Sequence, residues 1–237
     1  MRNEKVSISF LKPLIIAGVF TMMALVTGCL DEDGDPALPN LALVSFYHCA
    51  PNVNDLDIIV DGQTKVNDTP VGYGEYSDYL AFYTGQRDFE FVKDNNDDVL
   101  IDTTLTLLPN KTYSVFVANP LDSVQAVVLL DSAAAPDEGK AMIRFVHLSP
   151  DSPGLDIYIA DQKTFPELNY KSGTEFKEIA AGKKTLEFKT FDGTSEVLLT
   201  VPNVEIKSRE YYTVVLQGFA TPPTGITNGL ETEIINN

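Results

Sequence analysis

The chain of 237 residues contains no tryptophan, two cysteines, two histidines and half as many basic as acidic side chains. Seventeen Lys and Arg against 34 Asp and Glu give a formal net charge of −17, which disfavours nucleic acid as a partner. Two cysteines are too few for a disulfide-rich scaffold. Two histidines make a zinc site with three protein ligands hard to build, and we predict no metal and no cofactor. The hydrophobic fraction of 44% is nevertheless high enough for a folded core.

Residues 1–28 are predicted to be a secretory signal. A basic leader precedes an apolar run at 13–26, which is shorter than the ~18–20 residues that span a bilayer. The segment LVTGC, which ends at Cys29, resembles the bacterial lipobox, and this resemblance implies cleavage before Cys29 and lipidation of its thiol. The residue after Cys29 is Leu30. In enteric bacteria an Asp at this position is the signal that retains a lipoprotein in the inner membrane, so resemblance to that sorting rule favours the outer membrane. We therefore expect an outer-membrane lipoprotein that faces either the periplasm or the cell surface.

The remainder of the chain contains one unit twice. Residues 42–61 and 141–160 are identical at seven of twenty positions when they are aligned at an offset of 99. Further aromatic and glycine positions align at offsets of 97 to 99 up to the end of each copy. A repeat of this length is a whole domain rather than a solenoid unit. The predicted organisation is an acidic tether at 29–40, a first repeat at 41–131, a linker at 132–140 and a second repeat at 141–237.

Each repeat has the pattern of a β-sandwich. Runs such as Leu56/Ile58/Val60 alternate apolar and polar residues, and turn signals such as Asp61-Gly62 separate them. No long amphipathic helical stretch follows residue 40. We predict an all-β protein of two tandem immunoglobulin-like or transthyretin-like antiparallel sandwiches. The segment that ends at Tyr113 is similar to the corner of fibronectin-like domains, in which a Tyr hydroxyl caps upstream backbone.

The opening of the second repeat, FVHLSPDSPGLDIYI at 145–159, closely resembles the start of the bacterial domain-of-unknown-function 4397 family. The first repeat departs from the family pattern, since Ser45 replaces an Arg and Asn54 replaces the second Pro. The resemblance covers both repeats. It implies secreted or lipid-anchored β-domains, often in tandem, and no established activity.

The two histidines occupy equivalent positions in the repeats. His48 is followed by Pro51 and Asp57, and His147 by Pro150 and Asp156, and these six residues form the motif that the repeats share. A functional reading makes each His a general base that is oriented by the Asp. We favour a structural role, because each His ends the inward face of a predicted strand. Cys49 is predicted to be an inert thiol, since Leu148 replaces it in the second repeat.

Two further groups are weighed as binding sites. Tyr76 and Tyr83 have no aromatic equivalent in the second repeat, so they are free to form a ligand surface. Asp94, Asp97 and Asp98 carry oxygen ligands that suit calcium, but the EF-hand spacing fails and an ordinary turn explains them.

We expect a non-catalytic binding or interaction module of the cell envelope. The membrane is reached through the lipid anchor, and the partner is an unidentified envelope protein or glycan. Two alternatives stay open: a structural spacer, and a small hydrolase that uses the His and Asp of each repeat.

Overall fold

Alternating apolar and polar residues form strands throughout both repeats in the computed structural model, which describes residues 40–94 and 98–237. In the first repeat the elements are β1 (Leu41–His48), β2 (Leu56–Val60), β3 (Thr64–Lys65), β4 (Leu80–Tyr83), β5 (Gly85–Lys93), β6 (Val99–Leu107), β7 (Thr112–Ala118), the 3-10 turn η1 (Leu121–Ser123) and β8 (Gln125–Leu130). In the second they are β9 (Lys140–His147), β10 (Leu155–Ile159), β11 (Gln162–Leu168), β12 (Ser172–Gly173), β13 (Lys177–Ala180), β14 (Gly182–Thr190), β15 (Val197–Ile206), β16 (Tyr211–Gln217) and β17 (Glu231–Asn236). The predicted signal peptide, Cys29 and the tether to residue 39 lie outside the described residues.

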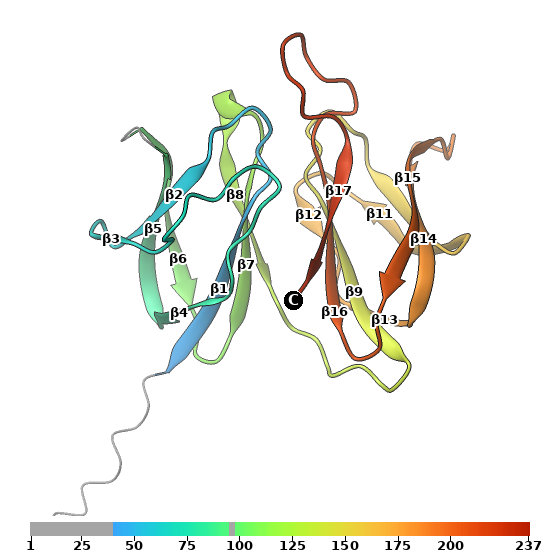
Figure 1. Ribbon diagram of the computed structural model, residues 1–237, viewed down its shortest axis with the longest axis horizontal. Coiled ribbons are helices and arrows are strands. Elements are labelled where there is room, and N and C mark those ends of the chain that lie inside the picture. Colours follow the sequence, from blue (N-terminus) through green and yellow to red (C-terminus); the bar gives the residue numbers. More distant parts are fainter. Residues whose placement is uncertain (1–39, 95–97) are drawn as a thin grey trace, which may run out of the picture. The chain divides into compact units, whose positions relative to one another are not determined.

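The first repeat is a sandwich of two four-stranded sheets (Figure 1). One sheet has the strand order β4-β1-β7-β8, and the other has the order β3-β2-β5-β6. Neighbouring strands are antiparallel except β1 and β7, which run parallel with Phe46 opposite Val115. Strand β1 therefore lies between β4 and β7, the next-to-last strand of its repeat.

The second repeat has the same topology. Its sheets have the orders β11-β10-β14-β15 and β12-β9-β16-β17, with β13 also paired to β9. Strands β9 and β16 are again parallel. The arrangement confirms the predicted all-β fold of two tandem sandwiches. Within residues 40–94 and 98–237, no helix has the length and hydropathy of a membrane span.

Buried aromatic side chains fill the core of each sandwich. The ring of Phe46 on β1 lies 5.6 Å from that of Phe89 and 5.9 Å from that of Phe91, both on the opposite sheet. Phe145 and Phe188 make the matching contact in the second repeat, at 5.9 Å. These residues occupy the predicted inward positions, where two-residue periodicity aims side chains into the core.

The predicted tyrosine corner is confirmed in the first repeat, and the second repeat contains the same contact. The Tyr113 hydroxyl accepts a hydrogen bond from the backbone N–H of Leu108, at 3.1 Å. The Tyr212 hydroxyl accepts the equivalent bond from Lys207, at 3.0 Å.

Part of the outer face of the β1–β7 sheet and part of that of the β9–β16 sheet are also buried, where the two repeats meet within the unit from Asn40 to Asn237. The residues of this third apolar cluster are Tyr47, Cys49, Phe116, Ala118, Val146, Leu148, Val215 and Ile235. Beside it, the Arg144 guanidinium lies 2.6 Å from the carboxylate of Asp131, and Arg144 is only 1% exposed. The linker thus joins two sandwiches that share a buried apolar cluster.

Candidate functional site in the first repeat

Both histidines are held by backbone groups on their two ring nitrogens. In His48, Nε2 donates to the carbonyl of Asn54 at 3.0 Å, and Nδ1 accepts the N–H of Ala50 at 3.3 Å. In His147 the partners are the carbonyl of Pro153 at 3.0 Å and the N–H of Ser149 at 3.4 Å. Burial lowers the pKa of both imidazoles, so the neutral form that these contacts require is favoured. The contacts fasten the loop after β1 and after β9.

The paired Asp residues of the motif contact cations and amides instead of the histidines. Asp57 lies 2.7 Å from the ammonium of Lys65. Asp156 is buried, and accepts hydrogen bonds from the Lys163 ammonium at 2.5 Å and the Glu167 N–H at 3.1 Å. These bonds join β10 to β11 in the second repeat and β2 to β3 in the first.

The other residues of the motif have equally local surroundings. Pro51 and Pro150 lie in the turns that follow the two histidines. Cys49 is 3% exposed within the third apolar cluster, and burial raises the pKa of its thiol. A thiol in this state is a poor nucleophile.

The acidic turn between β5 and β6 is described only in part, because Asp97 lies outside the described residues. The Lys93 ammonium lies 3.5 Å from the carboxylate of Asp98. The N–H of Asp94 donates to the carbonyl of Asp55, at 2.8 Å. In the described part of the chain, no group of three or more His, Cys, Asp or Glu residues is placed to hold a metal ion.

A break in strand pairing opens the edge of the first sandwich. The Val66 N–H still donates to the Ile58 carbonyl at 2.9 Å, but the chain then leaves β2 and returns to it at Val71, which pairs with Leu56. The buried side chain of Asn67 bridges the gap: its Oδ1 accepts the N–H of Ile58 at 2.8 Å, and its Nδ2 donates to the carbonyl of Leu56 at 3.1 Å. One amide side chain therefore substitutes for the missing backbone pairing.

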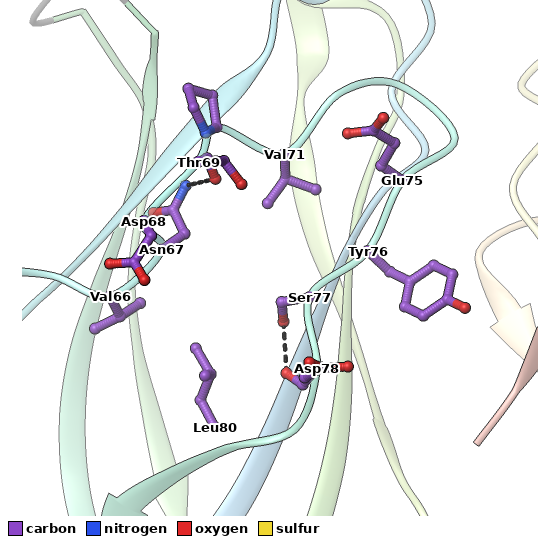
Figure 2. A pocket seen from close by; sticks show the side chains of 11 residues that line it. Val66, Asn67, Asp68, Thr69, Val71, Glu75, Tyr76, Ser77, Asp78 and Leu80 are labelled. Atoms are coloured by element: carbon purple, nitrogen blue, oxygen red, sulfur yellow. Dashed lines mark hydrogen bonds between the residues drawn. The ribbon is translucent and has the colours of Figure 1, made fainter.

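The gap produces a cavity of about 330 Å³ between this segment and the chain before β4. Figure 2 shows apolar side chains and Ser77 around its centre, with carboxylates at its margin. The lining residues are Val66, Asn67, Asp68, Thr69, Pro70, Val71, Glu75, Tyr76, Ser77, Asp78 and Leu80. Three of them are acidic and none is basic, so the cavity disfavours anions and offers hydrogen-bond acceptors.

Tyr76 lies between this cavity and a second, smaller one. The second cavity, of about 120 Å³, is lined by residues of both repeats, among them Tyr47, Tyr79 and Asn237. The Tyr76 ring is 44% exposed and stacks on the ring of Tyr47, with centroids 5.5 Å apart and planes at 24°. Tyr47 stacks in turn on Phe116 at 4.6 Å, so Tyr76 is held at the exposed end of a rigid aromatic column.

Tyr83 is exposed as well, at 63%, but it lines a different hollow, between β4 and the β2–β3 turn. The structure thus separates the two tyrosines that the sequence grouped as one ligand surface. Tyr76 belongs to the cavities beside segment 75–78, whereas Tyr83 lies at the end of β4.

Both repeats match one known family of domains. The model described as "Domain of unknown function (DUF4397)" matches residues 42–158 and 141–232. The chain belongs to the DUF4397 family. The two matches together span both sandwiches, as the resemblance of the repeat openings predicts. No curated protein matches this DUF4397 chain.

Among solved structures, the DUF4397 chain matches a leucine-rich repeat protein from Bacteroides thetaiotaomicron VPI-5482. The two are 13% identical, with a TM-score of 0.18. The match covers 78% of this chain and 26% of that one, so the chain spans about a quarter of the matched protein.

Sequence reasoning did not find Asn67 or Asp131. Asn67 is one of several Asn and Asp residues in a turn-rich segment, and nothing in its neighbours marks the side chain as buried. The two-residue change of offset between the repeats, from 99 to 97, falls in this region and is the available signal of an inserted bulge. In the second DUF4397 repeat the equivalent stretch continues as strand β11.

Proposed function

We propose that this DUF4397 protein is a lipid-anchored protein of the bacterial outer membrane that binds neutral glycan chains, without catalysis, through its first repeat. The observation that carries the proposal is the cavity beside segment 75–78, with the half-exposed Tyr76 ring at its border. The lipobox resemblance at Cys29 supports the anchor.

The chemistry of the cavity fits a polyhydroxylated ligand. Carboxylates such as Asp68 and Asp78 accept hydrogen bonds from hydroxyl groups, and an exposed aromatic ring packs against the apolar face of a sugar. The volume of about 330 Å³ is at the lower end of the ~300–1,000 Å³ range for small-molecule sites, which suits part of an extended chain.

The geometry of the segment favours an extended ligand. The His48 N–H donates to the Glu75 carbonyl at 3.0 Å, and the Ser77 N–H donates to the Phe46 carbonyl at 2.9 Å. In an antiparallel pair with this pattern, the N–H and C=O of the residue between them point away from the partner strand. The backbone of Tyr76 therefore presents one donor and one acceptor along the open edge.

A non-catalytic role is supported by the contacts of the residues that would catalyse hydrolysis. Both ring nitrogens of His48 and of His147 are engaged by backbone groups, and Asp57 is paired with Lys65. The thiol of Cys49 is buried and protonated.

The test is a binding measurement with the mature protein and a panel of neutral cello-, malto- and N-acetylglucosamine oligosaccharides. We expect binding to at least one of them, and we expect Tyr76→Ala to weaken it about tenfold, equivalent to about 1.4 kcal/mol. Tyr83→Ala is the matched control, because it removes a more exposed tyrosine side chain outside the cavity, and its affinity should equal that of the unsubstituted protein.

Two results would contradict the proposal. If Tyr76→Ala and Tyr83→Ala bind the oligosaccharide equally well, then the ligand lies elsewhere on the molecule. If no oligosaccharide in the panel binds, the neutral-glycan assignment is wrong and the structural spacer becomes the better account.

A further inference from the structure

Five exposed apolar side chains surround one end of the first sandwich. They are Leu41, Leu43, Tyr83, Leu108 and Leu130, with exposed fractions between 37% and 63%. We call this group the apolar tip. It lies at the lower end of the first repeat in Figure 1, where β1 begins and where the β4–β5 and β6–β7 turns lie.

Strand register places these residues at the same end. Leu41 pairs directly with Tyr83 across β1 and β4. Leu130 pairs with Tyr113 across β7 and β8, and the Tyr113 hydroxyl accepts the N–H of Leu108. The tip is therefore formed by neighbouring strand ends of one sandwich.

The second repeat shows that the fold does not require apolar residues at these positions. Strand register and the tyrosine corner identify the residues of the second repeat that are equivalent to the apolar tip. The register is that of β9 with β13 and of β16 with β17. The equivalent residues are Lys140, Met142, Ala180, Lys207 and Asn236. Of these only Met142 is a large apolar residue, and it is buried. The apolar character therefore belongs to the tip of the first repeat alone.

The sequence brings this same end close to the predicted anchor. Leu41 is twelve residues after Cys29, and an extended chain of that length reaches at most roughly 40 Å. Tyrosine and leucine side chains are favourable at the level of lipid headgroups, where Tyr keeps its hydroxyl in contact with water. Lys111 is exposed in the β6–β7 turn and supplies a positive charge to an otherwise acidic protein.

We propose that the apolar tip lies against the headgroups of the membrane that holds the anchor, and thereby orients the first repeat on the bilayer. The inference rests on the anchoring part of the proposed function and is independent of glycan binding. It adds a contact made by the folded body to the one made by the acyl chains.

The absence of tryptophan allows a direct test. Tyr83→Trp introduces a single reporter at the tip, and Ala180→Trp introduces one at the equivalent position of the second repeat. Each full-length lipidated protein is reconstituted in vesicles of phosphatidylethanolamine and phosphatidylglycerol that contain a dibrominated phosphatidylcholine. Flotation of the vesicles and the mass of the Cys29 peptide report the anchor, and tryptophan emission reports the tip.

Interfacial side chains lie about 5–10 Å into the headgroup and acyl boundary, so bromine should quench roughly half of the Tyr83→Trp emission and shift it to the blue. The Ala180→Trp emission should stay as it is in vesicles without bromine. Leu108→Trp is a second reporter at the tip and should behave as Tyr83→Trp does.

The anchor and the tip can fail separately. If the protein floats but neither tip reporter is quenched more than Ala180→Trp, the tip proposal is wrong and the anchor stands. If the protein does not float and Cys29 carries no acyl chains, both the anchor and this orientation are wrong, whereas oligosaccharide binding is unaffected.

Discussion

Each histidine side chain connects the end of a strand to the loop that follows it, through hydrogen bonds at both ring nitrogens. The Nδ1 atom accepts a backbone N–H, so it has no room for a proton of its own, and burial adds to the penalty for charging the ring. The same constellation in both repeats, with backbone partners two and six residues further along the chain, explains why the sequence keeps a His at this position.

The two neutral histidines, His48 and His147, predict a pH dependence of the free energy of unfolding. The unfolded chain takes up protons on His48 and His147 near the ordinary pKa of 6.5, whereas the folded pKa values are lower. The free energy of unfolding should therefore be largest above pH 6.5 and should fall as the pH drops below it, by up to about 1.4 kcal/mol per pH unit for each His. Denaturant titrations at several pH values between about 7.5 and about 5.5 measure how the free energy of unfolding changes over these roughly two pH units.

The control for this slope is the variant with both His48→Gln and His147→Gln. This variant should be less stable than the unsubstituted protein at about pH 7.5, which is roughly one unit above the ordinary histidine pKa. It should also lose much of the dependence of the unfolding free energy on pH. Glu233, whose pKa is raised by burial and by the charge of Glu231, contributes with the opposite sign, because the folded state holds its proton more tightly. An unchanged slope in the double variant would show that other groups titrate in this range.

At the scale of the element, the open edge depends on how segment 66–71 is attached. Strand β3 has two residues where β11 has seven, and the side chain of Asn67 provides two further bonds to β2 between the backbone bonds of Val66 and Val71. Its Nδ2 also donates to the carbonyl of Thr69 at 2.9 Å, which shapes the margin of the cavity. The cavity is therefore a consequence of one buried amide in a bulged edge.

Asn67→Ala should accordingly lower the free energy of unfolding by about 1–3 kcal/mol, because it leaves the buried Ile58 N–H without its partner. The Leu56 carbonyl loses its bond to Asn67 but still accepts the N–H of Val71 at 2.9 Å. Asn169→Ala is the control in the second repeat, since Asn169 is exposed and makes one long bond of 3.4 Å, and its effect should stay within about 0.5 kcal/mol. Equal effects in the two variants, measured by denaturant unfolding, would mean that the Asn67 amide does not hold the edge.

The sequence predicted the elements better than their contacts. Period-two patterns locate strands because core positions alternate, and the tyrosine corners follow from a local motif. The interface between the repeats has no local pattern of this kind. The available signal is the uninterrupted run Val115-Phe116-Val117-Ala118, since a strand buried on both faces shows apolar residues without alternation. The residues that cover this second face belong to the other repeat and lie up to about one hundred positions away in the sequence, so the run alone does not identify them.

At the scale of the whole molecule, the two repeats carry different residues at their shared interface. Arg144 occupies the position of Ser45, and strand register makes Asn237 the equivalent of Asp131. The Arg144 guanidinium donates to Ser114 at 2.8 Å and to Thr213 at 2.9 Å, and lies over the ring of Phe176 at 4.6 Å. Within residues 40–94 and 98–237, one Arg–Asp pair crosses the interface, with the Arg in the second repeat and the Asp at the end of the first, so the two sides of the interface are not equivalent.

This buried pair predicts that residues 40–237 unfold as one cooperative unit, with a single calorimetric transition. Asp131→Asn or Arg144→Met leaves one charge buried without its partner and should cost about 3 kcal/mol. The double variant should cost clearly less than the sum of the two, because neither charge then stays in the interface. Single variants that cost less than about 1 kcal/mol would contradict the argument, since that is the value of an exposed ion pair. Two separate transitions in the unsubstituted protein would show that the third apolar cluster does not couple the repeats.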